Sequence, residues 1–195
     1  MFNKSCEDKN QNHLNNKKKQ KTMMKLPNFI AEMKPELRYG LLIGLGISLW
    51  VLIEFLLGFH TTRMEMGQFT GYLSVIIPIL GLYYGLTEKY IKEPSITYWQ
   101  TVKAGMTMVL IAAVIISLFM ALYNTTIHPE WVEEGIAYEK QYLQEMNATA
   151  EEITQAEEAM KVMFSTEVQM LGSFIGVMIQ GFFLSLLISW LIRRK

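Results

Sequence analysis

Four long apolar stretches constrain this chain more than any other feature. They cover residues 39–59, 69–90, 102–125 and 170–192. A helix needs about 20 mostly apolar residues to cross a bilayer, and buried helices of water-soluble proteins rarely run this long without a polar face. The sequence therefore predicts an all-α membrane protein, built as a bundle of four transmembrane helices.

The chain is expected to divide into two parts of different composition. Residues 1–25 are rich in Lys and Asn and contain no apolar core, so they predict a disordered basic tail and not a signal peptide. Residues 26–195 form the predicted four-span membrane domain. Either Met1 or the Met23–Met24 doublet is compatible with a natural start.

The positions of Lys and Arg predict the orientation. Nine basic residues precede residue 39, three (Lys89, Lys92 and Lys103) lie in the second connection or at the span ends beside it, and three end the chain. The other three lie in the first and third connections. Because cytoplasmic segments carry the excess of Lys and Arg, both termini are predicted to be cytoplasmic, as an even number of spans requires.

The third connection is the one sizeable polar element. Between Tyr123 and Met170 it carries ten Glu residues against Lys140 and Lys161. The range 129–165 is therefore predicted to be an extracytoplasmic, acidic helical segment. Two interpretations stay open for it: a solvated cap over the ends of the spans, or a docking face for a protein partner or a second copy.

Local motifs divide this segment into two helices. Pro129 favours the start of a first helix, and Asn147 is expected to interrupt it. Thr149 with Glu152 three residues later is a capping box that starts a second helix.

Glycines at four-residue spacing recur in the spans. Small residues allow membrane helices to approach closely. The candidate packing residues are Gly40, Gly44, Gly58, Gly81, Gly85, Gly172 and Gly176. Pro78 removes one helical hydrogen bond from the second span and is expected to kink it.

Glu54 is the one acidic residue of the first span. It shares a helical stripe with Gly40, Gly44 and Gly58, which predicts that it faces the bundle interior. It is either protonated and donating a hydrogen bond, or paired with a cation at the outer mouth. Polar candidates within the membrane are Ser74, Ser117 and Gln180, and candidate partners at the mouth are His60 and Arg63. A structural hydrogen-bond node is the first hypothesis, ahead of a role linked to protonation.

No recognised catalytic or cofactor motif is present. The sequence lacks a dinucleotide-binding, P-loop or zinc-protease pattern. Cys6 lies in the predicted tail, and the histidines occur singly, which argues against a metal cluster. Paired carboxylates such as Glu151–Glu152 and Glu157–Glu158 could bridge a divalent cation, but no calcium-loop pattern accompanies them. We expect no catalytic residue, cofactor, metal site or nucleic-acid partner.

Three stretches resemble a known family: "YGLLIGLGISLWVLIEFLLGFH", "GYLSVIIPILGLYYG" and "YWQTVKAGMTMVLIAAVIISLFMALYNTTIHPEW". With the closing "GFFLSLLISWLIRRK", they are similar to the bacterial membrane proteins grouped as domain of unknown function 4199. The resemblance covers the chain from about Lys25 to its end. It implies a four-span protein of the bacterial inner (plasma) membrane and brings no activity, cofactor or catalytic residue.

The resulting hypothesis is a non-enzymatic membrane scaffold or accessory subunit. It would contact the lipid bilayer and meet a protein partner, or a second copy, through the outer acidic helices. The alternative is a small transporter or proton-linked channel that uses Glu54.

Overall fold

The computed structural model describes residues 32–194. The chain divides into two units, Met1–Lys34 and Pro35–Lys195, and all the helices discussed below belong to the second unit. The predicted tail over residues 1–25, and with it the question of the start at Met1 or Met23–Met24, lies outside the described residues.

Every regular element of the described chain is helical. The elements are α3 (Pro35–Leu56), α4 (Met64–Leu73), α5 (Ile76–Lys92), α6 (Tyr98–Leu122), a π-helix (Tyr123–Ile127), α7 (Trp131–Glu145), α8 (Ala150–Met163) and α9 (Thr166–Arg193). Four helical segments are long and apolar enough to cross a membrane when α4 and α5 are taken as one. The prediction of an all-α, four-span membrane protein is confirmed.

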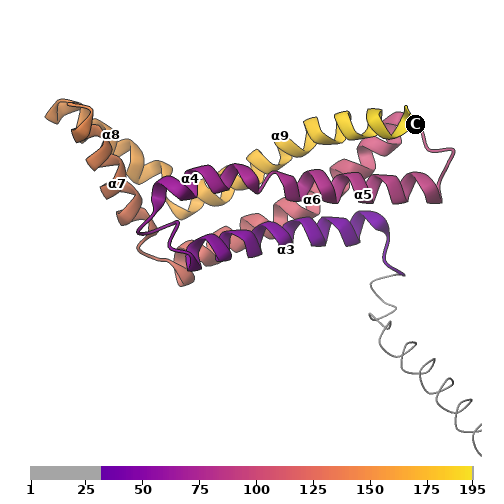
Figure 1. The fold of residues 1–195 in the computed structure, drawn as a ribbon, viewed down its shortest axis with the longest axis horizontal. Coiled ribbons are helices and arrows are strands. Elements are labelled where there is room, and N and C mark those ends of the chain that lie inside the picture. Colours follow the sequence, from indigo (N-terminus) through magenta and orange to yellow (C-terminus); the bar gives the residue numbers. More distant parts are fainter. Residues whose placement is uncertain (1–31, 195) are drawn as a thin grey trace, which may run out of the picture. The chain divides into compact units, whose positions relative to one another are not determined.

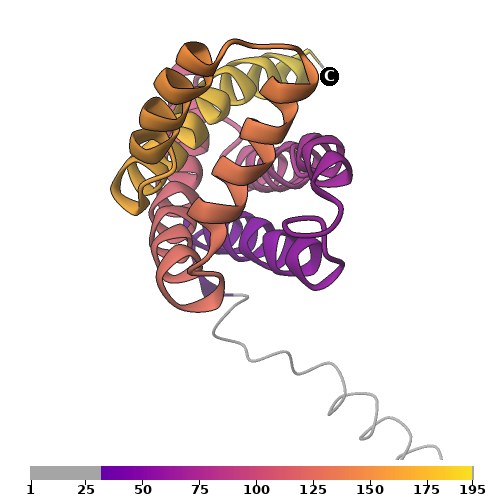
Figure 2. The same cartoon turned by 90° about the vertical axis from the view of Figure 1, so that its left-hand side faces the viewer.

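The four spans lie side by side, and the α7–α8 hairpin projects from one end of them (Figure 1). We call this the hairpin end. The opposite end, where α3 begins and α9 finishes, is the terminal end. Figure 2 views the bundle from the hairpin end, with α7 and α8 in front of the long helices.

The second span is two helices and not one, because Pro78 disrupts the ladder. α4 ends at Leu73 and α5 begins at Ile76. Proline has no N–H to bond the carbonyl four residues before it, and its ring clashes with that carbonyl. The carbonyl in question is that of Ser74, which instead accepts from the N–H of Ile77 at 3.1 Å. The break therefore lies one turn before the predicted kink position.

α6 is the central helix, in contact with α3, α5 and α9. Its capping box, Thr97 with Gln100, satisfies the first free backbone donors. Small residues line the contacts. A Cβ at Gly105 would lie 2.6 Å from Ser185 Oγ on α9, so α6 and α9 approach backbone to backbone there.

The seven predicted packing glycines fall into three groups. Four of them lie at helix contacts, where an added Cβ would be too close to a neighbouring side chain. At Gly40, Gly44 and Gly85 it would lie 2.8–2.9 Å from Ile111, Ile115 and Met108, respectively. At Gly81 it would lie 2.8 Å from Ile43 Cδ1. Gly58 lies in the turn after α3 with φ of 75°, so its role there is conformational and not the predicted helix contact. The structure does not place Gly172 and Gly176 at a contact, because nothing lies within 4 Å of their added Cβ.

The outward faces of the spans are apolar. Leu45 and Leu49 on α3 are 59% and 58% exposed, and Phe183 and Leu187 on α9 are 64% and 60% exposed. In water such a surface would be unfavourable, whereas acyl chains solvate it at no comparable cost. These faces therefore fit contact with a lipid bilayer.

Ion pairs tie α3 to α5 at the terminal end. Arg38 pairs with Glu88, which also accepts from the Tyr39 hydroxyl at 3.2 Å. Lys89 Nζ lies 2.9 Å from a Glu36 oxygen and 2.6 Å from a Glu93 oxygen. A hollow of about 790 Å³ opens beside Lys89 and Glu93. The charged residues flanking these spans thus pair with one another across the helix contact.

The α7–α8 hairpin follows the predicted motifs closely. Asn147, with φ of 60°, ends α7 in a Schellman arrangement: its N–H bonds the Gln144 carbonyl, and the Ala148 N–H bonds the Leu143 carbonyl. The Thr149–Glu152 capping box is present, and its hydrogen bonds from Thr149 lower the pKa of Glu152. Local sequence is therefore sufficient to explain both helix ends.

Candidate functional site

Glu54 lies close to the hairpin end of α3 and is 5% exposed. Two residues later α3 ends, and Gly58, in its left-handed conformation, turns the chain back. This turn brings His60 over the end of the helix, with His60 Nε2 3.6 Å from Glu54 Oε2. The prediction that Glu54 faces the interior agrees with its burial, and His60 is the partner that the structure places beside it.

A continuous chain of polar side chains starts at this pair. His60 Nδ1 lies 2.6 Å from the Tyr123 hydroxyl, and that hydroxyl lies 3.3 Å from His128 Nδ1. His128 Nε2 then lies 3.2 Å from Glu134 Oε2. We call Glu54, His60, Tyr123, His128 and Glu134 the polar chain. It links α3, the end of α6 and the first turns of α7.

The π-helix at Tyr123–Ile127 explains how two of these residues meet. In this wider turn the N–H of His128 bonds the carbonyl of Tyr123, five residues earlier, at 2.8 Å. The two side chains therefore lie on one side of the turn, with their rings edge to face and their centroids 5.9 Å apart. Pro129 follows, and α7 starts with Glu134 in its first turn.

Aromatic rings enclose the polar chain. The Phe55 ring lies 5.0 Å from the His128 ring and 5.8 Å from the Tyr123 ring, centroid to centroid. The Trp131 ring lies 5.8 Å from the His60 ring. Such a wall shields most of the polar chain from solvent, since Glu54, Tyr123 and His128 are all buried, and a low local dielectric strengthens hydrogen bonds.

The enclosure sets the charge state of His60. Burial lowers its pKa, and the neighbouring Glu54 carboxylate only partly opposes this effect. A neutral imidazole has one donor and one acceptor nitrogen. If Glu54 is the acceptor, Nε2–H of His60 faces Glu54 and Nδ1 accepts from the Tyr123 hydroxyl.

This arrangement orients the remaining members of the polar chain. In that tautomer the Tyr123 hydroxyl donates to Nδ1 of His60, and its oxygen is free to accept from Nδ1–H of His128. Nε2 of His128 then faces Glu134. The Glu134 oxygen 3.2 Å away is buried and has no hydrogen-bond partner among the described residues.

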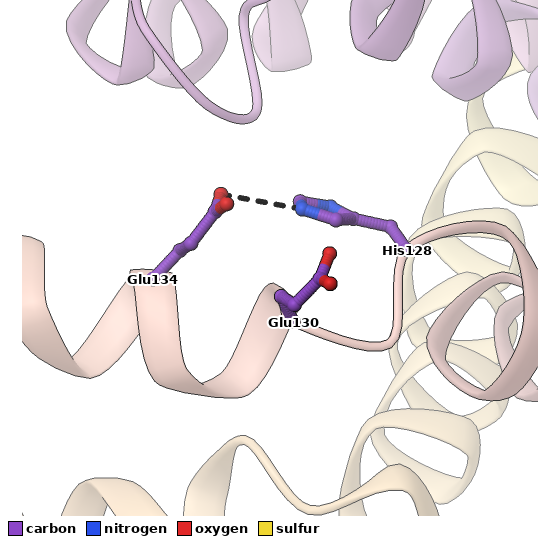
Figure 3. A group of neighbouring side chains, drawn as sticks. All are labelled: His128, Glu130 and Glu134. Carbon is purple, nitrogen blue, oxygen red and sulfur yellow. Dashed lines mark ion pairs between the residues drawn. The ribbon is translucent and has the colours of Figure 1, made fainter.

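Glu130 completes a group of three possible ligand side chains. One oxygen of Glu130, one of Glu134 and a ring nitrogen of His128 all lie within 4.8 Å of one another. Figure 3 shows Glu130 and Glu134 rising from the same helix toward the His128 ring. His128 is 3% exposed.

A cavity of about 260 Å³ adjoins His60. Trp131 and Phe164 form part of its wall, 6.0 Å apart between ring centroids, and Glu139 reaches its rim. Ser, Thr, Cys and Lys are not among its lining residues. Its volume suits a small apolar group or a few waters and is below the usual range for drug-sized ligands.

The other predicted polar residues do not join Glu54. The Ser74 hydroxyl donates to the Gly71 carbonyl, and the Ser117 hydroxyl donates to the Met170 carbonyl of α9 at 2.8 Å. Gln180 is half-buried on α9. Arg63 is exposed and forms no ion pair within the described chain that reaches Glu54. The residues predicted to surround Glu54 therefore lie apart from it, and its actual polar partners belong to the polar chain nearer the hairpin end.

Sequence reasoning missed Tyr123, Glu130 and Glu134, and it considered His128 only as one of the histidines that occur singly. A signal was present in "HPEWVEE" (residues 128–134). Proline after the histidine starts a helix, and carboxylates four residues apart then share one face. The paired carboxylates considered as cation bridges lie elsewhere. Among them, Glu157 is shared between Lys140 and Lys161, whose hydrogen bonds lower its pKa.

The fold and this site together define an integral membrane protein: a four-helix bundle with a polar cluster at one end. The family model described as "Protein of unknown function (DUF4199)" matches residues 38–194. The chain therefore belongs to this family. Comparison with curated proteins and with solved structures gave no match.

Proposed function

We propose that this protein is a non-enzymatic scaffold or accessory subunit of a bacterial inner membrane, with both termini in the cytoplasm. In this proposal the α7–α8 hairpin is presented on the extracytoplasmic side to a protein partner with a basic face. The observation that carries the proposal is the hairpin itself: an acidic element attached to the bundle through buried polar contacts.

The charge of the hairpin selects the kind of partner. The range 129–165 has nine Glu residues and two Lys residues. Both lysines pair with Glu157, at 3.4 Å from Lys140 and 3.2 Å from Lys161. The other carboxylates of α8, Glu151 and Glu158 among them, are exposed. A surface of this sign attracts a basic partner and steers its approach.

Exposed apolar side chains accompany the carboxylates. Met146 at the end of α7 is 63% exposed, and Val162 and Met163 at the end of α8 are 64% and 62% exposed. Methionine adapts its shape to different contact surfaces. Exposed carboxylates together with adaptable apolar residues therefore suit contact with a basic protein partner.

The alternative, a transporter or proton-linked channel, has one feature in its favour. The polar chain connects buried Glu54 to the hairpin end. Toward the terminal end, however, α3 has no ionisable side chain between Tyr39 and Glu54, and Ser48 bonds the Gly44 carbonyl of its own helix at 2.9 Å. A path that stops at Glu54 favours a structural role.

Site-specific photo-crosslinking tests the scaffold proposal. A photoreactive residue at Met163 should form an adduct with a partner that has a basic face. Adding the substitutions Glu151→Lys and Glu158→Lys should remove the adduct. The matched control is the same probe at Leu187, an exposed position of α9 facing lipid. An adduct from Met163 that is unaffected by the charge reversal would contradict the proposal.

A flux assay tests the alternative. The protein and its Glu54→Gln variant are reconstituted into liposomes that carry a pH gradient. The scaffold proposal predicts that neither dissipates the gradient faster than empty liposomes. Proton leak that depends on Glu54 would replace the scaffold proposal with the alternative.

A further inference from the structure

We propose that His128, Glu130 and Glu134 form a binding site for one divalent transition-metal cation of the zinc class. This inference goes beyond the proposed function, because the site lies at the root of the hairpin and not on its exposed face. It concerns the isolated protein, so it is tested without any partner.

The gap between His128 and Glu134 is the first observation. His128 Nε2 and Glu134 Oε2 lie 3.2 Å apart, yet the carboxylate oxygen makes no hydrogen bond among the described residues. In the tautomer with the proton on Nδ1, the Nε2 lone pair faces this oxygen, and two electron-rich atoms at this distance repel each other unless a cation lies between them. A metal ion would satisfy both atoms at once.

The geometry fits a zinc-class ion. Bonds of about 2.0–2.2 Å to nitrogen and oxygen in a tetrahedral site place neighbouring ligand atoms roughly 3.4 Å apart. The observed 3.2 Å between Nε2 and Oε2 already matches one such edge. An oxygen of Glu130 lies within 4.8 Å of a His128 ring nitrogen and of a Glu134 oxygen, and it is carried by an exposed side chain that can close the third position (Figure 3). Water would fill the fourth.

The donor types set the class of metal. Imidazole nitrogen with carboxylate oxygen suits zinc and its neighbours, whereas calcium and magnesium prefer oxygen ligands alone. Two carboxylates with a neutral imidazole also balance the charge of a divalent cation.

The hydrogen bond behind His128 supports the same assignment. Histidines that bind metal usually donate their other ring N–H to an acceptor, which fixes the tautomer and the ring orientation. Here the Tyr123 hydroxyl, 3.3 Å from Nδ1, is placed to be that acceptor. His128 is 3% exposed, so its ring has little freedom to turn away. The nitrogen left for the metal is therefore held in place before the metal binds.

Metal titration of the purified full-length chain in detergent tests the proposal. After chelator treatment, Zn²⁺ is titrated by calorimetry, and Co²⁺ is titrated by visible absorption, which reports low-coordinate nitrogen and oxygen ligation. We expect one equivalent per chain. Glu130→Gln and Glu134→Gln should each weaken binding by at least the 10–100-fold that loss of a second-shell partner costs.

Glu133→Gln is the matched control. It makes the same charge change in the same turn of α7, at an exposed residue outside the site, and it should bind like the parent. Glu130 is also exposed, so the Glu130→Gln variant should keep the melting temperature of the metal-free parent. Its metal affinity therefore tests the proposal even if Glu134→Gln fails to fold.

Two outcomes would overturn the proposal. One is the absence of saturable binding of either metal to the folded parent. The other is binding that persists unchanged in Glu130→Gln, or that disappears in Cys6→Ser, since the metal would then be held elsewhere.

Discussion

Gly181 and Gly176 provide a matched pair for testing how closely α6 and α9 approach. Both lie on α9, and both can be changed to Ala. A Cβ at Gly181 would lie 2.9 Å from Val109 Cβ and closer still to both Val109 methyl groups. A Cβ at Gly176 would meet nothing within 4 Å. The same substitution should therefore act in opposite directions.

Two terms determine the size of the effect. Replacing Gly by Ala within a helix gains about 0.8–1 kcal/mol at either position. At Gly181 overpacking costs about 1–3 kcal/mol. The cost should lie in the upper part of this range, about 2–3 kcal/mol, because Val109 is 3% exposed and β-branched and cannot rotate away. Gly181→Ala should thus lose about 1–2 kcal/mol, and the two variants should differ by about 2–3 kcal/mol.

Thermal unfolding in detergent, followed by tryptophan fluorescence, measures this difference. At about 2–4 °C per kcal/mol for a chain of this size, Gly181→Ala should melt about 4–12 °C below Gly176→Ala. Gly172→Ala is a second control, because its added Cβ also meets nothing within 4 Å. Equal melting temperatures for Gly181→Ala and Gly176→Ala would refute the close approach of α6 and α9.

Three further predictions concern the site and the hairpin. Since burial lowers the pKa of His60, the unfolded chain binds its proton first as the pH falls. The free energy of unfolding should therefore decrease below about pH 6.5, by at most about 1.4 kcal/mol per pH unit. If a His60→Gln variant shows the same pH dependence, His60 is not its cause. Glu54→Gln should unfold close to the parent because its amide has the same shape and keeps a polar group beside His60. Glu54→Leu removes that polar group and should cost about 1–3 kcal/mol; equal melting temperatures for the two variants would exclude a structural role. Thr149→Ala should remove the cap of α8, destabilise the helix by about 0.5–2 kcal/mol and speed amide exchange in α8. Thr154→Ala is the control and should leave that exchange unchanged, because the Thr154 hydroxyl bonds only the Ala150 carbonyl of its own helix.

Several features of this protein follow from the sequence because their causes are local. The length of an apolar stretch decides whether it can cross a membrane, and the four spans were predicted for that reason. The two ends at Asn147 and Thr149 depend on residues within one turn, so they were predicted as well. The break in the second span also has a local cause, but it lies at the carbonyl that Pro78 cannot bond and not at Pro78 itself.

The glycine pattern shows where local reasoning fails. Four-residue spacing placed Gly172 and Gly176 at a helix contact, yet the face of α9 that meets α6 is the one that contains Gly181 and Ser185. Four-residue spacing indicates only that the small residues lie along one face of their helix. Which stripe meets a neighbour depends on the rotation of each helix, and this is set by packing against all of the others.

The sequence by itself determined that the chain is a four-span membrane protein with an acidic segment before the last span. Only the tertiary structure decided that Glu54 meets His60, and that Tyr123 connects this pair to His128 and Glu134. These side chains come from segments far apart in the chain, and their separations depend on where α3 ends and α6 widens into a π-helix. Polar contacts of this kind require their atoms to lie within about 3–4 Å of one another. Hydrophobic patterning cannot supply that precision, and helix packing does.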